Sequence, residues 1–308
     1  MSVIDAEFCH AVTRYAQYLV LENPSFLKSI FIPGNCDMKS LVVVKSPVKQ
    51  IVFEQNRNIK QIVLRMSDLV EIPRTINKLT YLLEATFQFS NLEYLDLRLF
   101  CSLANIQELD LLWNNITTVT GNSADAVCQS ALKIIKLNEN SIRELSLDVF
   151  APFKKLVRLD LTSNKLESLL GSLANPALEQ LILTNNQLTV LDMCKWAKPN
   201  TMLELHVSFN HLSSVPLCLE ALGNVTYVDF RFNFIKLLDV QAFSALPKLE
   251  CINLSFNNIT TIPLDESVYS PVLKVLQLME NPLGNITIPT GSFEKLKIVL
   301  DNHPVKFL

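Results

Sequence analysis

Hydrophobic residues recur along most of the chain in one frame, L-x-x-L-x-L-x-x-N, of which Leu156-Leu159-Leu161-Asn164 is an example. Eight asparagines hold the last place of this frame: Asn114, Asn140, Asn164, Asn186, Asn210, Asn233, Asn257 and Asn281. Counted from the first apolar position, the steps between successive repeats are 26, 24, 22, 24, 23, 24 and 24 residues. This period predicts a solenoid in which every repeat is one coil stacked on the previous one.

Within each repeat, the second and third apolar positions are two residues apart, as Leu159 and Leu161 are. This spacing predicts a short strand with both side chains on one face, and stacked coils would pair such strands about 4.8 Å apart in a parallel sheet. Returns such as Phe150-Phe153-Leu156 would lead back to the next strand. The predicted fold is an α/β solenoid whose return side is irregular, 3-10 or briefly helical.

The asparagine has a physical role in such a coil. Its carboxamide carries two donors and an acceptor, so it can bond backbone groups of its own turn and of the neighbouring one. Leaving such groups buried and unpaired would cost about 1–3 kcal/mol each. The row of asparagines therefore predicts a buried hydrogen-bond ladder that runs from coil to coil.

With this frame, the chain resembles the leucine-rich repeat proteins of the typical subclass, whose repeats have about 24 residues. The resemblance covers about residues 59–300. It implies a right-handed horseshoe with a concave parallel sheet, and protein binding through that concave face. The chain is also loosely similar to secreted leucine-rich immune proteins of insects, notably the mosquito group.

A single solenoid of about ten coils would use nearly all of the 308 residues. We expect an N-terminal cap at 1–58, the solenoid at 59–298 and a short C-terminal end at 299–308. Within the cap, we expect strands between 41 and 56 and partial helix between 1 and 30.

The early repeats break the frame. Ser67 replaces the asparagine, and Leu92-Leu95-Leu97 opens a repeat only 14 residues before Ile106. The sequence therefore predicts that the solenoid is least regular at 73–106, with about ten residues missing from one coil near 98–100.

Composition narrows the choice of partner. Lys+Arg 27 nearly balance Asp+Glu 30, and there is no basic block, so nucleic acid and acidic membrane surfaces are poor candidates. No apolar run reaches the ~18 residues that a membrane span needs. Asp5, Glu7, Arg14 and Gln17 interrupt the N-terminal segment, which does not read as a signal peptide and by itself indicates a cytoplasmic protein.

The cysteines point the other way. Cys194 and Cys218 stand at the same phase of consecutive coils, which would bring them to the separation of a disulfide. Such a bond would contribute about 3 kcal/mol, and reduced thiols at matched phase by coincidence are the alternative. Cys9 and Cys36 flank the N-terminal segment and are a second candidate pair.

The other cysteines, Cys101, Cys128 and Cys251, have no obvious mates in the frame, and Cys251 is expected to stay single on the inner sheet. No cysteine or histidine spacing indicates zinc. Five N-x-S/T sequons occur, at Asn115, Asn224, Asn253, Asn258 and Asn285.

Asn115 and Asn258 directly follow a ladder asparagine and should point outward, although N-x-I-T turns arise in this repeat by chance. Together with the phase of Cys194 and Cys218, the sequons favour an extracellular, secreted glycoprotein. The absent leader would then reflect an incomplete 5′ end.

Residues between the apolar strand positions should point into the concave hollow. The predicted binding face consists of Tyr94, Glu108, Asp110, Lys136, Arg158, Asp160, Glu204, His206, Tyr227, Asp229 and Arg231. Tyrosine and arginine often anchor protein interfaces, and the acids suggest a protein partner with a partly basic surface. The alternative is that these are ordinary solvated residues.

No catalytic set is present. Glu204, His206 and Ser208 are alternate residues of one strand and point the same way, whereas a nucleophile needs a base aimed at it and an oxyanion site. No glycine-rich phosphate loop occurs, so we expect neither enzyme activity nor a cofactor. The favoured function is extracellular recognition or complex formation, with innate immunity as one setting. The alternative is an intracellular scaffold or regulatory subunit of an enzyme.

Overall fold

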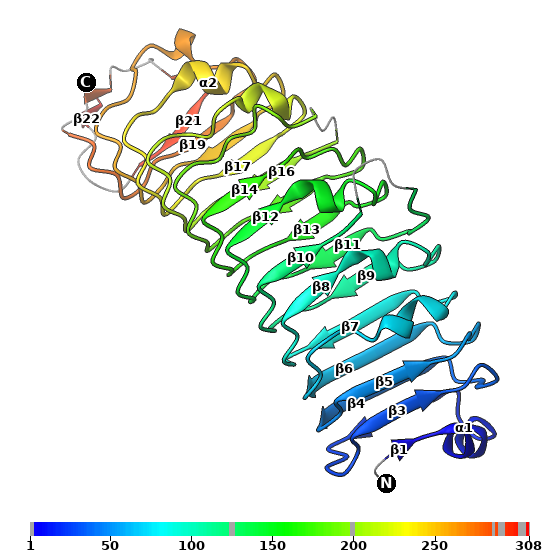
Figure 1. Ribbon diagram of the computed structural model, residues 1–308. Coiled ribbons are helices and arrows are strands. Elements are labelled where there is room, and N and C mark those ends of the chain that lie inside the picture. The colour runs from blue at the N-terminus through cyan, green and yellow to red at the C-terminus, as the bar shows by residue number, and fades with distance from the viewer. Residues whose placement is uncertain are drawn as a thin grey trace.

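The computed structural model shows an elongated, gently curved stack of coils, with the two chain ends at opposite ends of the stack (Figure 1). The structure describes residues 3–122, 127–197, 201–284, 287–288, 293–300 and 306–307. Within these ranges, a 13-stranded parallel sheet runs the length of the stack. We call it the main sheet, and we call the opposite face of the coils the back side.

Every coil gives the main sheet one strand. The strands, in spatial order, are β2 (Tyr18–Glu22), β4 (Ser40–Ser46), β6 (Gln61–Ser67), β7 (Glu84–Gln88), β9 (Glu108–Asp110), β11 (Ile134–Lys136), β13 (Arg158–Asp160), β15 (Gln180–Ile182), β16 (Glu204–His206), β17 (Tyr227–Asp229), β18 (Cys251–Asn253), β19 (Val275–Gln277) and β21 (Lys297–Val299). Equivalent positions face each other across coils, and from β9 to β19 each strand buries its central leucine, isoleucine or valine.

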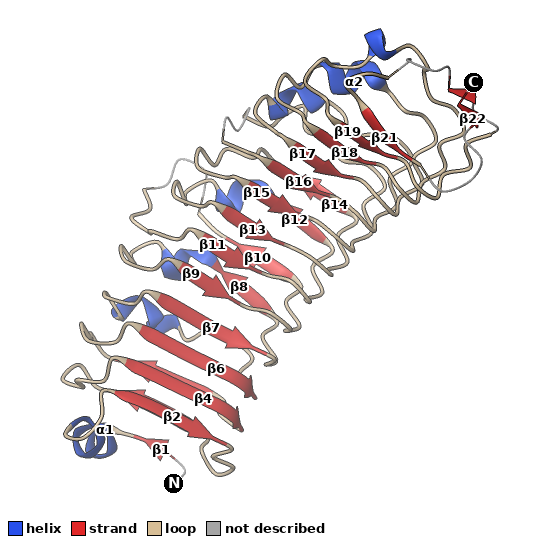
Figure 2. Cartoon of the chain, turned by 180° about the vertical axis from the view of Figure 1, so that it is seen from behind, coloured by secondary structure: helices blue, strands red, loops and turns tan. Residues whose placement is uncertain are grey.

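The back side carries further short strands and helical turns (Figure 2). The strands are β1 (Val3–Ile4), β3 (Ser29–Ile32), β5 (Gln50–Phe53), β8 (Tyr94–Asp96), β10 (Thr118–Thr120), β12 (Glu144–Ser146), β14 (Ser168–Leu170), β20 (Thr287–Ile288) and β22 (Lys306–Phe307). The helices are α1 (Ala6–Thr13), α2 (Val240–Ser244) and the 3-10 turns η1 (Arg74–Lys78), η2 (Leu97–Phe100), η3 (Leu147–Phe150), η4 (Leu219–Leu222) and η5 (Glu266–Val268). This is the predicted leucine-rich repeat solenoid, with a parallel sheet on one side and irregular returns.

The core is a continuous apolar file inside the coils. Strand positions such as Leu159 and Leu161 meet return residues such as Phe150 and Phe153, and all four are buried. Because each coil is too thin to enclose its own apolar residues, neighbouring coils cover them, and the core extends from end to end.

The prediction of irregular stacking at 73–106 is wrong. Strand β7 pairs with β6 and with β9, and the steps from Gln61 to Glu84 to Glu108 are 23 and 24 residues. The true strand motif of this coil is Leu82-Ala85-Phe87, in which alanine stands where a large aliphatic residue was expected. The motif Leu92-Leu95-Leu97 belongs to the back side, where β8 pairs with β10. No residues are missing from this coil.

The main sheet also begins earlier than expected. Strands β2 and β4 lie within 1–58 and continue the sheet in register with β6. Helix α1 lies within 1–30 and is capped at its N-terminus by Asp5, whose side chain accepts the N–H of Phe8. The sheet therefore has no break at residue 59, and a capping role for 1–58 remains a proposal.

The eight asparagines form the expected ladder. In Asn186, Nδ2 donates to the carbonyl oxygens of Leu161 and Leu183, both at 3.0 Å, while Oδ1 accepts the N–H of Leu166 at 3.0 Å. Each of the eight repeats this arrangement with its own coil and the preceding one. Seven are buried and Asn281 is half-buried. The carboxamides satisfy backbone groups that no strand ladder reaches.

Serines continue this row toward the N-terminus. Ser90 and Ser67 occupy the ladder place of the β7 and β6 coils, and both are buried. Their hydroxyl oxygens lie 2.8 Å apart, Ser90 Oγ accepts the N–H of Ser67 at 3.3 Å, and Ser90 donates to the Gln88 carbonyl at 3.2 Å. The ladder residue therefore changes from asparagine to serine at β7, while the strand register between coils is kept.

Candidate functional site

The outward face of the main sheet holds the predicted binding residues in two rows. The first row includes Glu108, Arg158, Glu204 and Tyr227, and the second row includes Asp110, Lys136, Asp160, His206 and Asp229. The strand register places equivalent residues of neighbouring coils opposite each other. Arg231 follows β17, just beyond the second row.

Tyr94 does not belong to this face. It lies in β8 on the back side, opposite Thr118, and its hydroxyl donates to Glu71. That hydrogen bond raises the pKa of Tyr94. The misplacement follows from the misread frame at 73–106, since Glu84 occupies the first-row place of this coil.

Residues that the sequence reading missed extend the first row toward the N-terminus. Ser40 Oγ donates to Gln61 Oε1 at 2.7 Å, and Gln61 Nε2 donates to Glu84 Oε2 at 2.8 Å. These hydrogen bonds join three coils side by side. The Leu82-Ala85-Phe87 motif would have predicted this extension of the first row, because it puts Glu84 in register with Gln61.

Each predicted basic residue of the face is paired with an acid. Lys136 Nζ lies 2.6 Å from Glu108 and 3.3 Å from Asp110. Partial burial of the ammonium disfavours its charge, but the hydrogen bond to Glu108 and the charge of Asp110 prevail and raise the pKa of Lys136. Lys136 is therefore a fixed cation between two coils.

The other pairs lie within single coils. Arg158 bonds Asp160 at 3.1 Å, and Arg231 Nε bonds Asp229 at 3.1 Å. His206 Nε2 lies 3.0 Å from Glu204, a contact whose charge depends on the protonation of the imidazole. Each pair holds a long side chain in one orientation on the open face.

The second-row aspartates are buried and act on the backbone. Oδ1 of Asp110, Asp160 and Asp229 each accepts the N–H two residues further along, at 3.1, 3.1 and 3.2 Å. Since their remaining oxygens face Lys136, Arg158 and Arg231, little acceptor capacity is left for a basic partner. The hydrogen-bond donors that remain available on this face belong to Lys136, Arg158 and Arg231. A partner that matches them would present acidic groups and not the basic groups that the sequence suggested.

An aromatic and thiol group sits beside these pairs. The His206 and Tyr227 rings contact each other at a centroid distance of 5.4 Å. Burial, then the charge of Asp229, raises the pKa of both the Tyr227 hydroxyl and the Cys251 thiol. These groups therefore stay neutral at physiological pH.

Glu204, His206 and Ser208, on and just after β16, do not form a catalytic set. His206 bonds Glu204, while the Ser208 hydroxyl lies 3.2 Å from Thr184 Oγ1. No group of three or more metal-ligating side chains occurs in the part of the chain that the structure describes. Over the same ranges, every helix is too short or too polar to cross a bilayer.

The structure pairs six cysteines in three disulfides. Cys9–Cys36 and Cys194–Cys218, the two predicted pairs, have Cα separations of 5.9 and 5.0 Å. Cys251 is a free thiol on the main sheet, as expected. All three bonds join neighbouring coils.

The third disulfide, Cys101–Cys128, has a Cα separation of 4.6 Å. The repeat frame showed no mate at matched phase for either cysteine, but the structure pairs the two with each other. The step from Glu108 to Ile134 is 26 residues, so the extra length of this coil shifts Cys128 out of phase with Cys101 in the sequence. The structure nevertheless joins the two sulfurs in a disulfide.

The sequons differ in exposure. Asn115 and Asn258 are exposed, and Asn224 is half-buried. Asn253 is buried, and its Oδ1 accepts the N–H of Ser255. Asn285 lies outside the described residues. Asn115 and Asn258 are therefore the sites with an accessible carboxamide.

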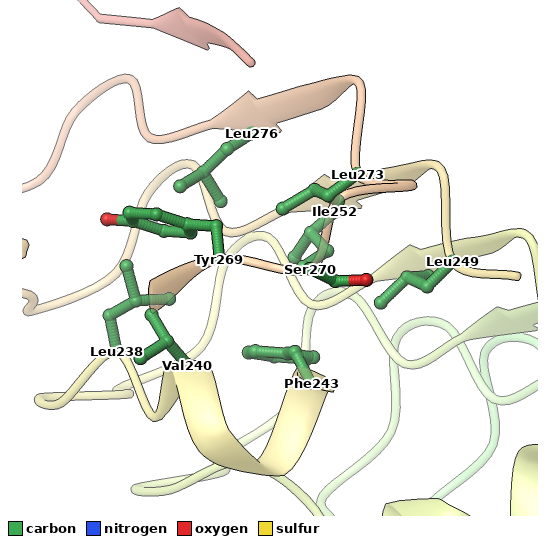
Figure 3. Close-up of a pocket in the computed structure, with 9 residues that line it drawn as sticks. All are labelled: Leu238, Val240, Phe243, Leu249, Ile252, Tyr269, Ser270, Leu273 and Leu276. Atoms are coloured by element: carbon green, nitrogen blue, oxygen red, sulfur yellow. The ribbon is translucent and has the colours of Figure 1, made fainter. Parts of the chain in front are cut away.

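The apolar core of the C-terminal coils leaves one small gap. Figure 3 shows a gap between the returns of two C-terminal coils, lined by Leu238, Val240, Phe243, Leu249, Ile252, Tyr269, Ser270, Leu273 and Leu276. It leaves a volume of about 10 Å³, at the lower limit for one water molecule. The Tyr269 hydroxyl bonds the Pro263 carbonyl, and burial raises the pKa of Tyr269. This gap is a packing defect and too small to hold a ligand.

Comparison with known proteins agrees with the repeat frame. The leucine rich repeat family model matches residues 104–166 and 223–283. The chain is similar to osteomodulin from Mus musculus, with 30% identity over 189 residues that cover 52% of this chain and 44% of that protein. Keratocan from Danio rerio is 28% identical over 227 residues, 63% of each chain.

Toll-like receptor 3 from Boselaphus tragocamelus is 28% identical over 148 residues, which cover 46% of this chain and 14% of that receptor. The matched segments thus span less than two thirds of each of these proteins. Nothing in these matches supports the resemblance to insect immune proteins.

Two solved structures share the fold. An internalin from Listeria monocytogenes has 16% identity and a TM-score of 0.57, covering 97% of this chain and 94% of its own. The leucine-rich repeat chain of FLRT2, solved in a complex with Latrophilin 3 and Unc5D, has 15% identity and a TM-score of 0.56 over 84% of each chain. The repeat frame, the asparagine ladder and these matches show that the chain is a leucine-rich repeat protein.

Proposed function

We propose that this protein is a non-enzymatic, extracellular recognition module that binds another protein on the outward face of its main sheet. The observation that carries the proposal is the set of fixed cations on that face. Lys136, Arg158 and Arg231 are each held by an acid, and part of each side chain stays accessible. Preorganised side chains lose little entropy on binding, so they favour recognition of a matching surface.

The disulfides support an extracellular setting. Three bonds between neighbouring coils are typical of proteins that fold in an oxidising compartment. Among the similar proteins, one is named a receptor, and the FLRT2 repeat chain was solved in a complex with other proteins. Innate immune recognition is one setting that the similarity to Toll-like receptor 3 suggests.

Thiol counting distinguishes this proposal from an intracellular scaffold. Native protein purified without reductant should show one reactive thiol after denaturation, from Cys251, and seven after reduction. Seven free thiols without reductant would instead favour the intracellular alternative.

Photo-crosslinking tests the binding face. p-Benzoylphenylalanine placed at Ile182, in the second row of the main sheet, is compared with the same group at Lys155, an exposed return residue. After incubation with extracellular fluid from the source tissue, we expect an adduct from the Ile182 position alone. Adducts from the Lys155 position alone would place the partner elsewhere and contradict the proposal.

A further inference from the structure

The turn after each main-sheet strand has an unusual backbone. The residue just before each ladder position has φ between 51° and 57°. These residues are Asn23, Lys45, Met66, Phe89, Trp113, Glu139, Ser163, Asn185, Phe209, Phe232, Phe256 and Glu280. This left-handed region favours asparagine or glycine and costs other residues about 1–2 kcal/mol. The backbone therefore gives no reason for an aromatic residue here.

Three consecutive coils nevertheless carry phenylalanine at this place. The rings of Phe209 and Phe232 stack at a centroid distance of 4.1 Å, and so do those of Phe232 and Phe256. Two residues further along, His211 and Phe234 form a parallel row with a centroid distance of 5.8 Å. We call these five residues the aromatic ridge.

The ridge is open to solvent. Phe209, Phe234 and Phe256 are 44%, 50% and 39% exposed. Because the stacked rings cover one another's faces, they present mainly their edges, which carry partial positive charge. Exposed aromatic side chains gathered in one patch are typical of interaction surfaces.

The charge beside the ridge is positive. Arg231 directly precedes Phe232 and is 46% exposed at its side chain, whereas its partner Asp229 is 2% exposed. Only Nε of Arg231 bonds Asp229, which leaves the terminal guanidinium nitrogens as unused donors among the described residues. Lys236, two residues after Phe234, is exposed and forms no ion pair within the described ranges. The acid Glu280 borders the ridge only at its C-terminal end.

We propose that the aromatic ridge and Arg231 dock an extended segment of a partner protein that carries aliphatic side chains next to carboxylates. The aliphatic groups lie against the ring edges, and a carboxylate takes the terminal nitrogens of Arg231. A guanidinium held in place binds a carboxylate through two parallel hydrogen bonds. Since the ridge directly follows β16, β17 and β18, this inference rests on the proposed function and specifies its partner.

Three fluorescein-labelled nine-residue peptides test the chemistry on the full, disulfide-bonded chain. One alternates glutamate with leucine, the second lysine with leucine, and the third glutamate with serine. By fluorescence anisotropy, we expect the glutamate–leucine peptide to bind about tenfold more tightly than either other peptide. Equal binding of the lysine–leucine peptide would overturn the proposal.

Phe232→Asn removes the central ring of the ridge. Asn185 occupies the same turn position two coils earlier, so the variant backbone is already present in the fold. We expect about a tenfold loss of affinity for the glutamate–leucine peptide, because truncation of a central aromatic anchor has effects of this size. Arg231→Lys keeps the charge beside Asp229 but loses the planar fork, and should weaken binding several-fold.

Trp113→Asn is the matched control. Trp113 has the same left-handed backbone and an exposed ring stacked on Phe89 at 6.0 Å, but it lies four coils away. This variant should bind the peptide like the parent chain. Unchanged binding by folded Phe232→Asn, or equal losses in both variants, would overturn the proposal. So would concentration-dependent self-association that Phe232→Asn abolishes, because a second copy would then occupy the ridge.

Crosslinking at Ile182 keeps the two proposals apart. An Ile182 adduct together with a failed peptide experiment removes the ridge and leaves the main-sheet face as the binding site. Peptide binding without an Ile182 adduct supports the ridge chemistry and moves the partner off the second row.

Discussion

Two halves of the solenoid hold the same coil shape by different means. From β9 onward, strands in the main sheet have three residues, and each coil closes with a carboxamide that bonds two carbonyls and one N–H. In the coils of β4 and β6, the strands have seven residues and the ladder place holds a serine. Where the main-sheet strands are longer, the residue at the ladder place thus forms fewer side-chain hydrogen bonds.

The difference shows which interactions the frame requires. Strands β4 and β6 pair over six residues in register, whereas β11 and β13 pair over three. Each net backbone hydrogen bond contributes about 0.5–1.5 kcal/mol, so a few additional pairs offset the bonds that asparagine supplies elsewhere. The rung is therefore replaceable where the strand is long and indispensable where it is short.

The largest expected effect is loss of a rung in the asparagine half. Asn186→Ser would leave the buried N–H of Leu166 without its acceptor. It would also remove one of two donors to each of the carbonyls of Leu161 and Leu183, which keep their bonds to Asn164 and Asn210. At about 1–3 kcal/mol for the unpaired N–H and about 0.5–1.5 kcal/mol for each lost bond, we expect the free energy of unfolding to fall by about 2–6 kcal/mol, measured by urea denaturation. A loss below about 1 kcal/mol would show that the two kinds of rung are equivalent.

The next effect concerns the disulfide that supports the serine half. Replacing Cys9 and Cys36 with serine opens a loop of 27 residues and should cost about 3.5 kcal/mol in the chain-entropy model. Hydrogen exchange should rise mainly in β2 to β6, because these coils have no asparagine at the ladder place that follows each main-sheet strand. The matched control replaces Cys194 and Cys218, whose neighbouring coils keep Asn186 and Asn210. If exchange spreads equally in both variants, the rungs do not set local stability.

The frame from Ile106 onward was predictable because large aliphatic residues mark every strand there. The coil of β7 was not, since Ala85 fills the strand position and Leu92-Leu95-Leu97 copies the motif on the back side. The serine rungs were not predictable either. Ser67 was visible as a departure from the frame, but its bond to Ser90 depends on the true position of β7.

The rows of the candidate face were predictable from strand periodicity, apart from Tyr94. Their energetics were not, because a two-residue period does not show that Asp110, Asp160 and Asp229 are buried and already bonded. The aromatic ridge was missed for a different reason. It follows the strands, at left-handed turns whose side-chain direction no strand or helix period describes.

A smaller effect is expected in the serine half. Ser67→Ala removes one hydroxyl contact with Ser90, and the free energy of unfolding should fall by about 1 kcal/mol in urea denaturation. Ser90→Ala should cost more, about 1–3 kcal/mol, because it also leaves the Ser67 N–H without its acceptor. If Ser67→Ala costs as much as Asn186→Ser, the long strands do not compensate.

The smallest effect lies at the C-terminal end, where a carboxylate joins two coils. Glu266 accepts the N–H groups of Glu294, Lys295 and Leu296 at 3.1, 2.9 and 2.9 Å, and these bonds lower the pKa of Glu266. Because the folded pKa is lowered, this contribution is present above the ordinary glutamate pKa of about 4.3 and is lost as pH falls through the lowered value.

Hydrogen exchange of these three amides, corrected for the intrinsic pH dependence, measures this contribution. Protection should be full near neutral pH and should decrease as the Glu266 carboxylate is protonated in acid. Glu266→Gln should show weaker protection at neutral pH and a flatter response to acid, while Glu250→Gln, whose carboxylate contacts Lys274 at the exposed surface, should behave like the parent chain. Identical protection in Glu266→Gln and parent would mean that the Glu266 carboxylate does not stabilise the last coils.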